Sequence, residues 1–169
     1  MAKTYSEISH NIKHRENSKD EFYTPVELAK YTISMLDLKP KDIVLDSAFG
    51  TGNYYNNYPS WTTNKYTTDF FNFNEKVDWI VTNPPYSKID DYLKHSAEIC
   101  EKGFAYLLGH DNVTARRIEY LEKMGFYITK FHLCKVMKWF GMSVFVVWEK
   151  KTSDFKGIID YDRNVWKMD

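Results

Sequence analysis

The stretch DIVLDSAFGTG, residues 42–52, places a short apolar run directly before a turn that contains two glycines. The run favours a buried strand over residues 42–46, because aliphatic and β-branched side chains pack well on a pleated surface. Gly50 and Gly52 let the backbone turn tightly and come close to a ligand, and Asp46 adds a carboxylate at the strand end. The stretch therefore predicts a strand followed by a ligand-binding turn, although a turn without a ligand explains this pattern, taken alone, equally well.

A second stretch, VDWIVTNPPYSK at residues 77–88, runs from an apolar strand into Asn83, two prolines and Tyr86. Residues 77–82 are the clearest predicted strand of the chain. In a parallel sheet covered by helices, ligands bind beyond the carboxyl ends of the strands. A proline turn with an incidental tyrosine is the simpler explanation, but it leaves the amide and the ring without a purpose.

The segment from Asn83 to Tyr86 suits a reaction at the exocyclic amine of a nucleobase. The lone pair of this nitrogen is delocalised into the ring, so the amine is a poor nucleophile. The Asn83 side-chain oxygen and the Pro84 carbonyl would accept hydrogen bonds from the two N–H groups and so localise the lone pair on the nitrogen. The fixed proline dihedrals would hold these two oxygens in place. Tyr86 would stack on the base. A sulfonium leaving group would make a strong general base unnecessary, because the proton can leave after transfer.

The rest of the chain alternates predicted helices and strands. Thr24 and Glu27 form a potential capping box, and Pro25 suits the first position of a helix that ends near residue 38. Further helices are predicted at 89–100 and 112–124, with Gly125 ending the second, and further strands at 61–64, 66–70, 103–108, 126–134 and 143–148. The order predicts an α/β fold: a mostly parallel twisted sheet with helices on both faces and a C-terminal antiparallel hairpin.

The composition excludes few function classes. Lys and Arg number 23 and Asp and Glu number 23, so no overall positive charge indicates a polyanionic partner, although a local basic face would be sufficient. Cys100 and Cys134 have no metal-binding spacing and form no disulfide framework, which predicts no metal site and favours a cytoplasmic location. No apolar run is long enough to span a bilayer. Residues 1–20 are expected to form a polar arm and residues 21–169 a single domain.

Four segments together resemble the S-adenosylmethionine-dependent methyltransferases that modify the N6 amine of adenine in DNA. Residues 21–25, EFYTP, resemble the segment that lies against the methionine moiety of the cofactor. Residues 46–52 resemble the Asp-x-x-x-Gly-x-Gly cofactor loop, and residues 83–86 match the Asn-Pro-Pro-Tyr catalytic signature. Asp69 and Phe70 resemble the acid and the apolar residue that the family places near the cofactor adenine.

This resemblance implies a Rossmann-like class I methyltransferase fold, S-adenosyl-L-methionine as the cofactor, and a catalytic domain over residues 21–169. It implies catalytic roles for Asn83, Pro84, Pro85 and Tyr86. It implies cofactor contacts for Phe22, Tyr23, Thr24, Pro25, Asp46, Ser47, Ala48, Phe49, Gly50, Gly52, Asp69 and Phe70.

The chain departs from the family pattern in three ways. The family binds the cofactor ribose through an acid after the second strand, but residues 60–64 contain no acid. We therefore expect either weak cofactor affinity or ribose contacts supplied by other residues. The short spacing between Gly52 and Val77 predicts that the usual third strand and its helix are trimmed. No segment after the hairpin resembles a target-recognition domain, so a homodimer or a separate recognition subunit is expected to supply recognition.

A local cluster of basic and aromatic residues predicts a nucleic-acid contact. Lys135, Lys138 and Trp139 interleave charge and an aromatic ring at the predicted hairpin tip, which suits contacts to a phosphate backbone and to a base. Arg116 and Arg117 would add charge from the preceding helix. A solvated face would contain the same residues. With the resemblance, the cluster favours DNA as the partner.

Two other classes of function remain compatible with the sequence. The same tetrapeptide occurs in methyltransferases of RNA bases and of protein glutamine amides, whose nitrogen is equally electron-poor. A non-catalytic domain that binds cofactor or nucleic acid, or serves as a subunit, fits the missing ribose acid and the missing recognition domain. The intact segment 83–86 opposes that last reading, and residues 22–25 favour the DNA enzymes.

Overall fold

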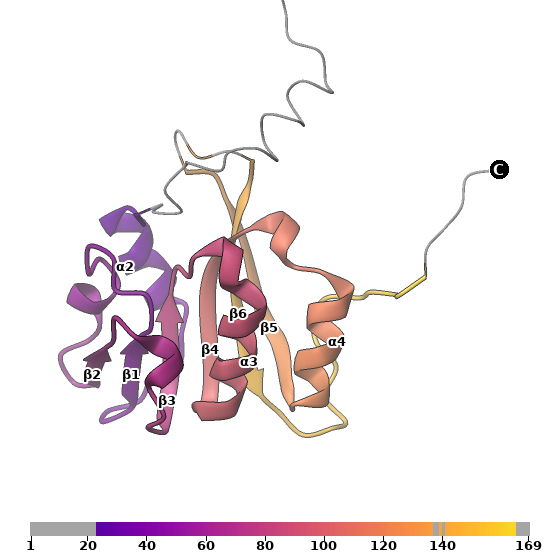
Figure 1. Ribbon diagram of the computed structural model, residues 1–169, viewed down its shortest axis with the longest axis horizontal. Coiled ribbons are helices and arrows are strands. Elements are labelled where there is room, and N and C mark those ends of the chain that lie inside the picture. Colours follow the sequence, from indigo (N-terminus) through magenta and orange to yellow (C-terminus); the bar gives the residue numbers. More distant parts are fainter. Residues whose placement is uncertain (1–22, 137–138, 140, 165–169) are drawn as a thin grey trace, which may run out of the picture.

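A computed structural model describes residues 23–136, 139 and 141–164 of the chain (Figure 1). The predicted arm at residues 1–20 lies outside the described residues, as do Phe22 and Lys138. The helices are α2 (Val26–Ser34), α3 (Ile89–Ile99) and α4 (Ala115–Lys123). The strands are β1 (Ile43–Asp46), β2 (Thr63–Tyr66), β3 (Val77–Thr82), β4 (Cys100–Gly109), β5 (Phe126–Cys134) and β6 (Ser143–Lys150).

The six strands form one sheet in the order β2-β1-β3-β4-β6-β5. β1 pairs in parallel with β2 and β3, and β3 pairs in parallel with β4. β6 is antiparallel to both β4 and β5, so the predicted parallel sheet with a C-terminal hairpin is confirmed. Ser143 pairs with Gly109 on one side and Cys134 on the other, and the hairpin turn therefore emerges at the carboxyl edge of β4.

Helices cover both faces of the sheet, as the sequence predicts (Figure 1). Alternate residues of β4 show the division: Phe104 and Tyr106 join the core that includes α3 and α4. Ala105 and Leu107 join the core that includes α2. Both sets are buried because successive side chains of a strand point to opposite faces, so one apolar run serves two layers.

The start of α2 differs from the predicted capping box. Pro25 takes the N-cap position, and no side chain of the described residues makes a capping hydrogen bond there. Thr24 is buried instead, and its backbone carbonyl accepts a hydrogen bond from Asn53 Nδ2 at 2.7 Å. The segment before α2 is thus fixed to the turn after β1, and this tertiary contact overrides the local capping preference.

The chain between β1 and β3 is simpler than predicted. It contains one strand, β2, and two short 3-10 turns at Tyr55–Asn57 and Phe70–Asn72, with no α-helix. The predicted strand at residues 66–70 is wrong, because the chain turns after Tyr66 and buries the Phe70 ring beside α3. The expected trimming agrees with this short connection.

The predicted helix at residues 112–124 begins later. His110–Asn112 form a 3-10 turn, and α4 starts at Ala115, where Thr114 accepts a hydrogen bond from the Arg117 backbone N–H at 3.4 Å. Gly125 has a φ of +84°, so its predicted role in ending the helix is confirmed.

Candidate functional site

A cavity of about 450 Å³ lies at the carboxyl ends of β1, β2 and β3. It brings together the segment before α2, the glycine turn after β1 and the Asn-Pro-Pro segment after β3, which are far apart in the sequence. Its lining residues are Tyr23, Thr24, Asp46, Ser47, Ala48, Phe49, Gly50, Thr51, Asn53, Tyr54, Thr67, Thr68, Asn83, Pro85 and Tyr92. Of the predicted cofactor contacts within the described residues, Pro25, Gly52, Asp69 and Phe70 are not part of this lining.

Asp46 is a buried carboxylate in the floor of this cavity. Thr82 Oγ1 donates to its Oδ1 at 2.7 Å, and the backbone N–H of Tyr55 donates to its Oδ2 at 3.3 Å. Burial raises the pKa of Asp46, and the hydrogen bond from Thr82 offsets part of this effect. A cationic ligand group would therefore meet a poorly solvated carboxylate, which is a strong attraction at short range.

Ser47 supplies a second polar group to the cavity. Its hydroxyl oxygen is buried and has no hydrogen-bond partner among the described residues. The Ser47 carbonyl accepts from the Tyr92 hydroxyl at 3.3 Å, which fixes the backbone while leaving the side chain available. Because an unsatisfied buried hydroxyl costs roughly 1–3 kcal/mol, the hydroxyl indicates a place for a polar ligand atom.

Gly50 and Gly52 shape the turn beneath the cavity, with φ values of +51° and +76°. A Cβ built on Gly52 would lie 2.8 Å from Cζ of Phe49, whose ring lines the cavity. The predicted role of the two glycines in a tight turn is therefore supported by the backbone, and Gly52 acts through Phe49.

Residues 60–64 were expected to follow the second strand, but the structure places them at its start. Residues 60–64 lie at the amino end of β2, where Thr62 Oγ1 donates to Asn64 Oδ1 at 2.5 Å. The carboxyl end of β2 leads into Thr67 and Thr68, and these two residues line the cavity. The error followed from dividing one strand into two in the sequence.

Asp69 and Phe70 follow directly but face elsewhere. The Asp69 carboxylate accepts from Asn72 Nδ2 at 2.8 Å, within its own turn. The Phe70 ring lies 4.9 Å from the Tyr92 ring, centroid to centroid, and is buried in the core. Phe70 thus supports Tyr92, which itself reaches the cavity.

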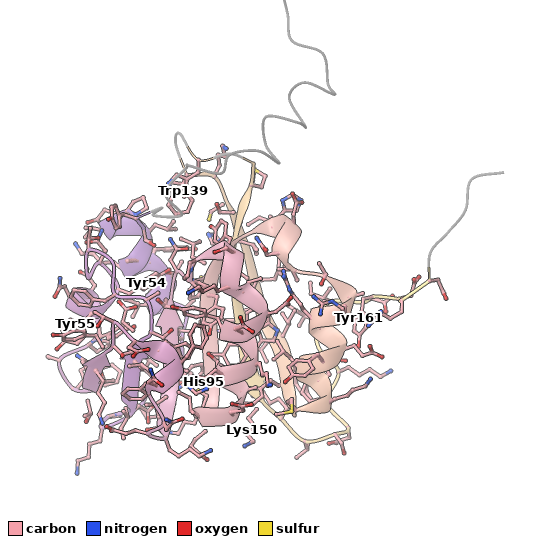
Figure 2. The ribbon with its side chains drawn as sticks, in the orientation of Figure 1. Tyr54, Tyr55, His95, Trp139, Lys150 and Tyr161 are labelled. Atoms are coloured by element: carbon pink, nitrogen blue, oxygen red, sulfur yellow. The ribbon has the colours of Figure 1, made fainter. Side chains whose placement is uncertain are left out.

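A smaller cavity of about 190 Å³ lies beyond the carboxyl ends of β3 and β4. Its lining residues are Tyr86, Gly109, His110, Asp111, Asn112, Trp139, Gly141, Met142 and Ser143. Figure 2 shows Trp139 at the tip of the hairpin, away from Tyr54 and Tyr55 near β1 and β2. Asn83 and Pro85 line the large cavity while Tyr86 lines the small one, so the predicted catalytic tetrapeptide spans both.

The predicted nucleic-acid residues divide into two groups. Lys135 Nζ donates to the carbonyls of Trp139 and Gly141, each at 2.5 Å, and so stabilises the hairpin turn. Arg116 and Arg117 both pair with Asp90 of α3 and line a separate hollow between α3 and α4. The hydrogen bond from Arg117 lowers the pKa of the Asp90 carboxyl.

The described residues contain neither a membrane-spanning helix nor a metal-binding cluster. No helix there is both long and apolar enough to cross a membrane. No group of three or more His, Cys, Asp or Glu residues there is arranged to hold a metal ion.

The chain matches no protein-family model and no curated protein with significance. Solved structures do match it. Magnesium protoporphyrin IX methyltransferase ChlM from Synechocystis, with bound S-adenosylmethionine, is 10% identical, with a TM-score of 0.56 over 89% of this chain and 86% of that chain. Precorrin-6y C5,15-methyltransferase from Geobacter metallireducens is 11% identical, with a TM-score of 0.60 over 79% and 92% of the two chains. The fold is that of the class I methyltransferases.

TrmN from Thermus thermophilus is a third match, 15% identical with a TM-score of 0.55. It covers 80% of this chain, which spans only 51% of that protein.

Six residues that line the large cavity were not predicted from the sequence. They are Thr51, Asn53, Tyr54, Thr67, Thr68 and Tyr92. Tyr92 was correctly predicted on the buried face of its helix, but only the structure shows that its hydroxyl reaches the loop after β1.

Proposed function

We propose that this protein transfers a methyl group from S-adenosylmethionine to the exocyclic N6 amine of adenine in DNA. The observation that carries the proposal is the position of residues 83–86 between two cavities. Asn83 and Pro85 face the cavity that contains a buried carboxylate, and Tyr86 faces the smaller cavity beside Trp139. A methyl donor in the large cavity and a flat methyl acceptor in the small cavity would therefore meet at this tetrapeptide.

The large cavity fits the chemical groups of S-adenosylmethionine. Asp46 would hold the ammonium of its methionine part, and the Ser47 hydroxyl would satisfy a polar atom of the ligand. Thr67 and Thr68 would take the ribose hydroxyls with neutral hydrogen bonds. The cofactor, when bound, supplies an electrophilic methyl carbon on a sulfonium that leaves as a neutral thioether.

The tetrapeptide would prepare the acceptor nitrogen. Asn83 Oδ1 and the Pro84 carbonyl would accept hydrogen bonds from the two N–H groups of the amine and so localise the lone pair on the nitrogen. Tyr86 would stack on the flipped base, with Trp139 closing the same cavity. The nitrogen lone pair forms the bond to the methyl carbon, and one nitrogen proton then passes to water, so a strong general base is not required. Positioning for in-line approach remains the main task of the protein.

DNA contacts would extend from the hairpin tip. Lys135 is exposed there beside Trp139, and Arg116 keeps an exposed side chain on α4.

RNA bases and glutamine amides are the competing acceptors. The aromatic pair of Tyr86 and Trp139 in the small cavity favours a flat ring over an amide. Incubating the protein with methyl-labelled cofactor and separate pools of DNA, RNA and protein tests this choice. Label in DNA, found by nucleoside mass spectrometry as N6-methyladenine, is the expected result. Label confined to RNA or to protein would replace the proposed substrate.

The variant Asp46→Asn is expected to weaken S-adenosylmethionine binding roughly 10- to 100-fold, because a charge-assisted hydrogen bond is lost. It should also stabilise the cofactor-free protein at neutral pH. Burial raises the folded-state pKa of Asp46 above 3.8, so its contribution to stability is full below about pH 3.8 and is lost as pH rises through the folded pKa.

Thermal denaturation as a function of pH measures this effect. The melting temperature of Asp46→Asn should exceed that of the wild type at pH 7 and approach it below the ordinary pKa of 3.8. Calorimetric titration with the cofactor should show tighter binding by the wild type. Equal affinities would show that Asp46 does not contact the ammonium.

A further inference from the structure

Asn112 is a polar residue of the small cavity whose orientation is fixed from outside it. Its backbone oxygen and its Oδ1 both accept hydrogen bonds from Arg117 Nη1, at 2.7 and 3.2 Å. Arg117 is held in turn by Asp90, whose Oδ1 accepts from Nε at 2.7 Å. The Arg117 side chain is only 16% exposed, so this arginine is anchored on both sides. The amide oxygen of Asn112 consequently faces α4.

The amide nitrogen of Asn112 lies on the cavity side. A Cβ built on Gly109 would be 3.4 Å from Asn112 Nδ2 and 3.7 Å from Cε2 of Tyr86. The nitrogen and the edge of the tyrosine ring therefore flank the same small space at the end of β4. Within the described part of the chain, the hydrogen bonds of the Asn112 side chain are limited to the one accepted by Oδ1. Nδ2 can thus donate to a ligand in the cavity.

We infer that Asn112 selects the acceptor by donating a hydrogen bond from Nδ2 to a ring nitrogen on the amine-bearing edge of the base. Arg117 and Asp90 are positioning residues that keep the donor, rather than the oxygen, directed into the cavity. This inference rests on the proposed function and deepens it. The class of acceptor is a flat heterocycle that carries a hydrogen-bond acceptor beside its amine. A ring with an N–H group at that place would bring two donors together and be rejected.

The inference changes the role of Arg117. From the sequence it was a candidate for phosphate contact, but its guanidinium is committed to Asp90 and Asn112. Arg116 offers a matched control, because it donates to the other oxygen of Asp90 at 2.9 Å and, within the described part of the chain, forms no hydrogen bond with Asn112. Arg116→Ala and Arg117→Ala remove the same charge from adjacent positions, and only the second frees the amide.

Duplex DNA with adenine, 1-deazaadenine or 7-deazaadenine at the target position provides the test. Both kcat/KM and equilibrium binding are measured, and each analogue is compared between proteins, which cancels its intrinsic reactivity. The wild type is expected to discriminate against one of the two analogues by about tenfold. Asn112→Ala and Arg117→Ala should lose this discrimination. Arg116→Ala should lower the affinity for natural DNA and for analogue DNA by the same factor, so this variant should keep the discrimination of the wild type.

Asn112→Asp is a second variant that preserves shape and the contact with Arg117. It replaces the donor by an acceptor, so the preference should invert, with adenine handled less well than the discriminated analogue. Discrimination by Asn112→Ala equal to that of the wild type, or none by the wild type against either analogue, would overturn the inference alone. A wild type that binds cofactor yet methylates no DNA would overturn the proposed function, and this inference with it.

Discussion

Asn83→Ala is expected to lower the rate of methyl transfer by roughly 100- to 1,000-fold, the range found when one acceptor or donor of a developing charge is removed. The cofactor affinity should remain largely unchanged, because Asp46 and Ser47 provide the proposed polar contacts to the methionine part. Asn83 directly follows Thr82, whose hydroxyl donates to Asp46 at 2.7 Å. This hydrogen bond joins the ends of β1 and β3. The proposed sites for the methyl acceptor and for the methyl donor are therefore held rigidly relative to each other. Single-turnover transfer and calorimetric titration measure the two quantities separately.

Two matched variants separate the chemistry at Asn83 from its packing. Asn83→Asp keeps an oxygen acceptor at the same distance from the backbone and should retain much more activity than Asn83→Ala. Asn83→Gln keeps the amide but displaces it by one methylene, and misplacement of about 1 Å is enough to cost roughly 100-fold. Full activity in Asn83→Ala would remove Asn83 from the mechanism, whatever the other variants did.

The two loops were predictable because each follows an apolar run that can only be a buried strand. Residues 42–46 and 77–82 are too short and too apolar for surface helices, and their polar continuations must then share the carboxyl edge of a parallel sheet. Thr24 was assigned to a cap that does not form, since nothing in the sequence shows that Asn53 binds its carbonyl. Local pattern thus specified these two strands, and long-range contacts determined how the residues around them are arranged.

The role of Arg117 shows a second limit of sequence reasoning. A basic residue on a polar helix face looks the same whether it faces a phosphate or a partner 27 positions away, as Asp90 is. The prediction of β2 failed for a related reason. Its residues Thr63–Tyr66 are half-exposed at the sheet edge and show no clear alternation of apolar and polar residues. Edge elements and charged pairs depend on what packs beside them, and a single sequence does not contain that information.

Gly52→Ala is expected to reduce both stability and cofactor affinity. Its φ of +76° is costly for a residue with a side chain, about 1–2 kcal/mol. The added Cβ would also lie 2.8 Å from Phe49 Cζ and 2.9 Å from Asn56 Nδ2, so the Phe49 ring must move. Because that ring lines the large cavity, we expect a total destabilisation of roughly 2–4 kcal/mol and cofactor binding weakened at least about tenfold.

Gly125→Ala separates the backbone effect from the effect on the cavity. Gly125 has a similar φ of +84°, but within 4 Å a Cβ there would meet only one atom of the described residues, the Lys151 carbonyl oxygen at 3.9 Å. Its substitution should cost about 1–2 kcal/mol of stability through strain alone and leave cofactor affinity as in the wild type. Thermal denaturation and calorimetric titration of both variants give the comparison. If Gly52→Ala lost stability but bound the cofactor as well as Gly125→Ala does, the Phe49 ring could not be part of the cofactor site.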